Sequence, residues 1–186
     1  MAKYCNPTVL DAAWNTIKNT CTRMIACSAQ PTSYYEAVEA EAFVGTAAVS
    51  LGAVVRPATR NGFVYEVTTA GTTGAAEPVW PTTAGTTVTS GTAVFTCRAN
   101  YAVADVAMVA ADLVVGVGTP NGRTLTVAAK NAVAIDVTAT ANHVALVDDT
   151  GLKLLYVTTA TAIALTTGAG NTVNFPSWKA NIADPV

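Results

Sequence analysis

Short runs of alternating apolar and polar residues dominate the second half of the chain, from Tyr101 onward. The runs are rich in Val, Thr and Ile, which favour strands. Gly, Asn and Asp residues interrupt them at intervals of about eight to twelve residues, a spacing typical of β-sandwiches and barrels. This half of the chain is therefore predicted to be almost wholly β-structure.

The clearest hairpin lies in the sequence HVALVDDTGLKLLYVTT, residues 143–159. Alternate positions of a strand point to opposite faces, which separates Ala145 and Val147 from Val144 and Leu146. The DDTG tetrapeptide between the two runs suits a tight turn, because Asp and Gly tolerate its backbone angles. We expect this hairpin to have one buried face.

One amphipathic helix is predicted near the start of the chain. Asn6 is a good N-cap and Pro7 suits the first helical position. The apolar residues that follow at helical spacing are Leu10, Ala13, Trp14 and Ile17. This face must pack against the β-structure.

Residues 42–99 differ in composition from the rest of the chain, with many Gly-Thr and Thr-Thr pairs between three short apolar runs. The strand pattern then resumes at Tyr101. We interpret residues 42–99 as a small β module inserted into a host domain formed by residues 1–41 and 100–186. The predicted host fold is a β-sandwich or Greek-key barrel with the N-terminal helix docked on it.

The composition excludes several classes of protein. Only 12% of the 186 residues are charged and 51% are hydrophobic, which suggests that neighbouring molecules cover much of the surface. No apolar run approaches the roughly 18 residues that span a bilayer, and the first ten residues lack the apolar core of a secretory signal. The ten basic residues are scattered and the net charge is −2, which argues against nucleic-acid binding. We expect synthesis in a cytoplasm.

The four cysteines form no CxxC pair, and His143 is the only histidine, so a zinc site is not expected. Buried thiols are the favoured interpretation of Cys5, Cys21, Cys27 and Cys97, with a disulfide formed after assembly as the alternative.

Candidate catalytic residues have simpler structural interpretations. His143 would need a nucleophile and an orienting acid, and none is indicated. Asp148 and Asp149 suit a hairpin tip, and Asp105 and Asp112 fit a turn or a sheet edge better than a catalytic pair. The acidic residues Glu36, Glu39 and Glu41 are interpreted as a solvated face. The sequence therefore predicts a protein that is not an enzyme and holds no metal or cofactor.

The host portion resembles a family of small tailed-phage virion proteins encoded among head genes. The resemblance lies in CSAQPTSY, TATANHVAL and the surrounding sequence, and covers about two thirds of the chain. It implies a head-decoration (cement) protein on the capsid surface that bridges major capsid protein subunits. We expect homotrimers with the host domain at the shared interfaces. A tail or baseplate component is the alternative.

The insert, recognised by VVRPATRNGFVYEV and PVWPTTAGTTVTSGTAVFTCR, is similar to small carbohydrate-binding modules of the chitin-binding type. Such modules stack sugars on exposed aromatic rings. The resemblance makes Tyr65 and Trp80 the candidate platform for a host glycan. Phe43, Val49 and Ala53 depart from the pattern, which leaves fewer rings for stacking. The insert is expected to face solvent.

Overall fold

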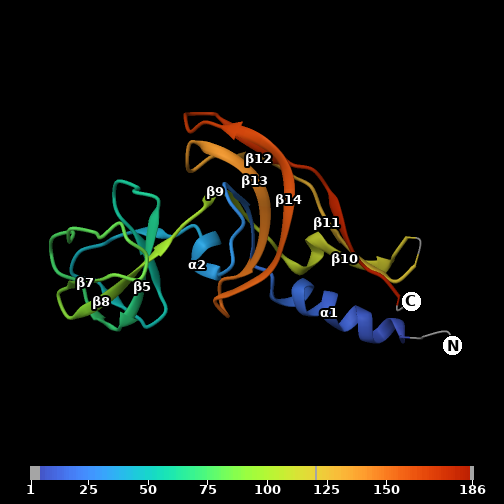
Figure 1. Ribbon diagram of the computed structural model, residues 1–186, viewed down its shortest axis with the longest axis horizontal. Coiled ribbons are helices and arrows are strands. Elements are labelled where there is room, and N and C mark those ends of the chain that lie inside the picture. Colours follow the sequence, from blue (N-terminus) through green and yellow to red (C-terminus); the bar gives the residue numbers. More distant parts are fainter. Residues whose placement is uncertain (1–4, 120, 185–186) are drawn as a thin grey trace.

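A computed structural model describes residues 5–119 and 121–184. The protein is mainly β and sandwich-like, with one long helix near the N-terminus, so the predicted fold class is confirmed. The strands form two units at opposite ends of the long axis (Figure 1).

Three helical segments and sixteen strands make up the described chain. The helical segments are α1 (Pro7–Thr20), α2 (Tyr34–Ala37) and the 3-10 turn η1 (Ala110–Asp112). The strands of the host domain are β1 (Arg23–Cys27), β9 (Ala102–Ala107), β10 (Leu113–Val117), β11 (Arg123–Val127), β12 (Lys130–Ala134), β13 (Ala139–Asp148), β14 (Lys153–Leu165), β15 (Thr172–Phe175) and β16 (Trp178–Ile182). The strands of the insert are β2 (Glu41–Ala42), β3 (Ala48–Val49), β4 (Val54–Arg56), β5 (Phe63–Thr69), β6 (Gly71–Thr72), β7 (Thr87–Ser90) and β8 (Ala93–Ala99).

The predicted helix is present as α1. The Asn6 side chain accepts a hydrogen bond from the Thr8 backbone N–H at 2.9 Å, and Pro7 opens the helix. Trp14 and Ile17 are its buried residues. Trp14 also donates its indole N–H to the backbone oxygen of Arg123, which fixes α1 against β11.

The main host sheet is antiparallel in the order β14-β13-β1-β9, and both of its faces are covered. Leu146 belongs to the larger hydrophobic cluster on one side, whereas Ala145 and Val147 belong to a second cluster with Tyr34 and Val38 on the other side. The expectation of a hairpin with one buried face was therefore wrong for β13. The second face is buried because α2 and the residues after it pack on it.

The rest of the host domain consists of a three-stranded sheet, β10-β11-β16, and a two-stranded ribbon, β12-β15. Leu113, Leu125, Val127 and Phe175 from these strands join the same cluster as Trp14. The sandwich core therefore lies between the main sheet and these shorter strands, with α1 closing one side.

The insert has its own sheets, β2-β4-β5-β8-β7 and β3-β6, and its own hydrophobic cluster. Tyr65, Phe95 and Cys97 are fully buried in this cluster. These sheets span 41–99, almost the same residues as the predicted module at 42–99. That the module was inserted into an older host domain stays a prediction.

Candidate interaction groove

β14 forms an open edge of the main host sheet. It has thirteen residues, and within the described chain β13 is its one paired strand. Lys153, at the first position, is its sole charged side chain, and the strand contains no proline. Native edge strands usually carry such residues or a cover, because unpaired main-chain groups otherwise recruit another strand. Two register shifts against β13 accompany the curvature of β14 seen in Figure 1. The outer edge of β14 has no paired strand within the described residues.

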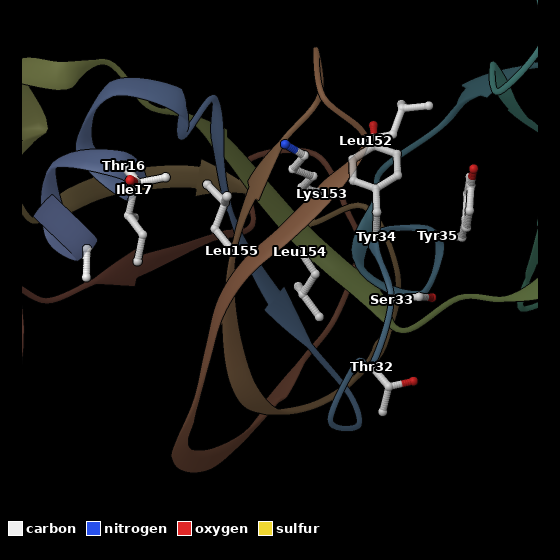
Figure 2. Close-up of a pocket in the computed structure, with 11 residues that line it drawn as sticks. Thr16, Ile17, Thr32, Ser33, Tyr34, Tyr35, Leu152, Lys153, Leu154 and Leu155 are labelled. Atoms are coloured by element: carbon white, nitrogen blue, oxygen red, sulfur yellow. The ribbon is translucent and has the colours of Figure 1, made fainter.

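A groove of about 680 Å³ follows the first part of this edge (Figure 2). Residues 152–155 lie between two walls, with α1 forming one wall through Ala13, Thr16 and Ile17. Residues 32–35 form the other wall. Because α1 and α2 cover opposite faces of the sheet, the groove lies where the sheet itself ends.

Leu154 and Leu155 of β14 face different walls of the groove. In Figure 2, Leu155 points toward α1 and Leu154 points away from it. Leu155 packs against the cluster that contains Ile17, and Leu154 packs against the cluster that contains Tyr34. An added strand at this edge would have α1 on one of its faces and residues 32–35 on the other.

Tyr34, at the groove wall, is held by a hydrogen-bond network. Its hydroxyl donates to Asp149 Oδ1 at 2.9 Å, and Asp149 Oδ2 accepts from Arg23 Nε at 3.2 Å and from Thr22 Oγ1 at 3.0 Å. Burial, and then the negative charge of Asp149, raise the pKa of Tyr34 above its ordinary value. The Tyr34 hydroxyl is therefore a donor whose direction is set by Asp149.

Tyr35 links this wall to the insert. Its hydroxyl donates to Glu66 Oε1 at 2.8 Å, and Arg98 pairs with Glu66 Oε2 at 2.7 Å. Burial, together with the hydrogen bond to Glu66, raises the pKa of Tyr35 to about 12. Lys153 is the one charged residue that lines the groove, and it makes no ion pair with any described residue. The groove thus suits recognition better than acid–base chemistry.

His143 lines a second cavity, of about 390 Å³, between the far part of β14 and β15. Its Nδ1 lies 2.6 Å from Asn142 Oδ1. The cavity is lined mainly by Ala, Val, Ile, Leu and Phe side chains, and no carboxylate or thiol is among its lining residues. His143 therefore has no orienting acid in this cavity.

The predicted glycan platform of Tyr65 and Trp80 is wrong with respect to Tyr65. The Tyr65 side chain is fully buried, and its hydroxyl donates to the Pro81 backbone oxygen at 2.7 Å. Trp80 is partly exposed, but it packs on the Tyr65 ring at 4.2 Å between centroids and edge-on against Phe43 and Phe95. Two parallel exposed rings are therefore not available, and sugar binding through Trp80 alone stays a prediction.

The interpretation of Glu39 as part of a solvated face was also wrong. Its side chain is only 14% exposed and is clamped by the Arg60 guanidinium, with Arg56 Nε 3.6 Å away. Arg56 and Arg60 belong to the insert, so Glu39 ties the insert to the host domain. Burial, and then the charges of Glu39 and Asp105, raise the pKa of Asp136 to about 6.

The other acidic candidates have structural partners. Asp105 lies on the edge strand β9 and pairs with Arg23 at 3.1 Å. Asp112 lies in η1 and pairs with Lys130 at 2.7 Å. Asp148 accepts a hydrogen bond from the Gly151 N–H in the β13–β14 turn. These carboxylates stabilise turns and strand contacts.

All four cysteines are free thiols in the structure, and Cys21, Cys27 and Cys97 are buried. Burial raises the pKa of Cys27 to about 12 and is the main cause that raises the pKa of Cys21 to about 11. Such thiols are poor nucleophiles at neutral pH. Within residues 5–119 and 121–184, no group of three or more His, Cys, Asp or Glu side chains could hold a metal ion.

Comparisons with protein-family models, with curated proteins and with solved structures find no match to this chain. No helix in the described part of the chain is long and apolar enough to cross a membrane.

The groove was not predicted from the sequence. Its residues come from three separate segments, and none carries a motif that indicates ligand binding. One signal was visible in the sequence: after Lys153, the next charged residue is Lys179. The absence of charged residues from 154 to 178 indicated an uncharged surface, but it did not indicate an open sheet edge.

Proposed function

We propose that this protein is a structural component of a tailed-phage virion that decorates the head, where it bridges neighbouring major capsid protein subunits as a homotrimer. The observation that carries an assembly function is the long unpaired edge of β14 beside an open groove, since the free main-chain groups of such an edge can pair with a strand of another molecule. The virion and the head are suggested by the resemblance of the host-domain sequence to small phage head-gene products.

Exposed apolar side chains on both units fit an adhesive function. The most exposed are Val79 at 94%, Val117 at 80% and Leu51 at 71%. Covering about 1,000 Å² of mainly apolar surface at roughly 25 cal/mol per Å² gives a gross gain on the order of 25 kcal/mol, much of which association costs offset. A modest apolar interface could therefore hold the protein on a shell without any reaction.

Counting copies of the protein per purified particle tests this proposal. Head decoration requires copies in the hundreds, on the order of the capsid subunits themselves, because every equivalent position of a symmetric shell is filled. A handful of copies would support a tail or baseplate component instead. Particles that lack the protein altogether would overturn the proposal.

A further inference from the structure

We propose that β14 pairs with β14 of a second copy, antiparallel about a twofold axis, so that the far half of each strand fills the groove beside the near half of the other. The inference rests on the proposed assembly function and names the partner of the groove. The two main host sheets would join through β14 into one continuous sheet. Main-chain hydrogen bonds along the strand supply affinity, and the grooves set the register.

The charge pattern of β14 favours this partner. From Leu154 to Leu165 the strand has no charged residue, so antiparallel self-pairing brings no like charges together. Pairing centred on Thr159 places each Lys153 opposite Leu165 of the other copy. The two lysines then lie up to about 40 Å apart along the strand, well beyond the screening length of about 8 Å at physiological ionic strength. Parallel pairing in register would instead place them side by side.

The two ends of β14 differ in their surroundings. The near end, residues 153–155, lies in the groove between α1 and residues 32–35. The far half is extended and uncharged, and its Ile163 is 51% exposed. Pairing centred on Thr159 places Ile163 of the second copy opposite Leu155, beside Ile17. One twofold operation therefore fills both grooves and covers both isoleucines.

This contact is separate from the proposed threefold contact of a homotrimer. A twofold contact is isologous, because the same patch is used on both copies, whereas a trimer needs a different, head-to-tail interface. Neighbouring trimers on a shell could meet through β14. In solution, the twofold contact alone gives dimers. Combined with the threefold contact, it links one trimer to another.

Two charge variants test the pairing. Thr159→Lys with Thr161→Lys, and Thr159→Glu with Thr161→Glu, change exposed residues near the centre of β14. Like charges across the axis are expected to weaken self-association about tenfold for each variant alone. Mixing the two variants should restore the paired species, because opposite charges then face each other. Light scattering coupled to gel filtration, at the highest soluble concentration, measures the mass.

Thr87→Lys with Thr89→Lys is the matched control, since it adds two lysines at the same spacing to the exposed positions of β7. This control should keep the mass of the wild type. A wild type that remains monomeric, or a mixture of the two charge variants that stays unpaired, would overturn the strand pairing. If the pairing fails but the protein is abundant in purified particles, the proposed function still stands. If the protein pairs but is absent from particles, the proposed function is contradicted and the strand pairing is not.

Discussion

Trp14→Ala is expected to lower the free energy of unfolding by about 3–5 kcal/mol. Trp14 is 4% exposed, donates its indole N–H to the Arg123 backbone oxygen at 3.1 Å, and packs edge-on against Tyr156. Removing the indole leaves a cavity between α1 and the sheets and takes one hydrogen-bond donor away from the Arg123 carbonyl. Urea denaturation followed by circular dichroism measures the change.

Val9→Ala is the control on the same helix, because Val9 is 63% exposed. Its cost should stay within about 0.5 kcal/mol, as for other surface substitutions. Since α1 forms one wall of the groove, Trp14→Ala should also weaken self-association. A Trp14→Ala protein as stable as Val9→Ala would contradict the docking of α1.

Glu39→Gln is expected to lower the free energy of unfolding by about 2 kcal/mol, below the usual cost of breaking a buried ion pair because Arg56 and Arg60 are partly exposed. The amide cannot balance two guanidinium groups. Local opening between the insert and the host domain should follow, which limited proteolysis at the junction detects. Glu41→Gln is the control, since Glu41 is exposed and the change there should cost little.

The same variant should change the titration of Asp136. The pKa of Asp136 is about 6, partly because Glu39 repels its charged form, so Glu39→Gln should lower that pKa. Because the raised pKa lets the folded state bind a proton that the unfolded state has lost, this group reduces stability as pH rises from about 4 to 6. The dependence should be weaker in the variant. An unchanged Asp136 titration, followed by NMR, would show that Glu39 does not act on this carboxyl.

The elements that are coded locally could be predicted from the sequence. Asn6, Pro7 and the spacing of Trp14 and Ile17 define α1 without reference to any distant residue. The alternation in β13 and β14 and the turn at residues 148–151 define a hairpin in the same way. The fold class follows from such signals, since each depends on only a few neighbouring residues.

The groove and the environment of single residues could not be predicted, because they depend on pairing across the chain. Tyr34 meets Asp149 across 115 positions, and nothing near either residue indicates the contact. The sequence spacing of Glu39 suggests an exposed carboxylate, and only the contact with Arg60 in the folded protein buries it. The aromatic ring of Tyr65 is of the kind that stacks on sugars, but in the folded protein Trp80 packs over this ring and helps to bury it.

An image of the intact particle at side-chain resolution is the most direct test of the edge of β14 as an assembly surface of a virion. We expect the protein on the head, with each β14 paired to β14 of a neighbouring copy. Particles in which the protein is present but this edge faces open solvent, or in which the protein is missing, would contradict it.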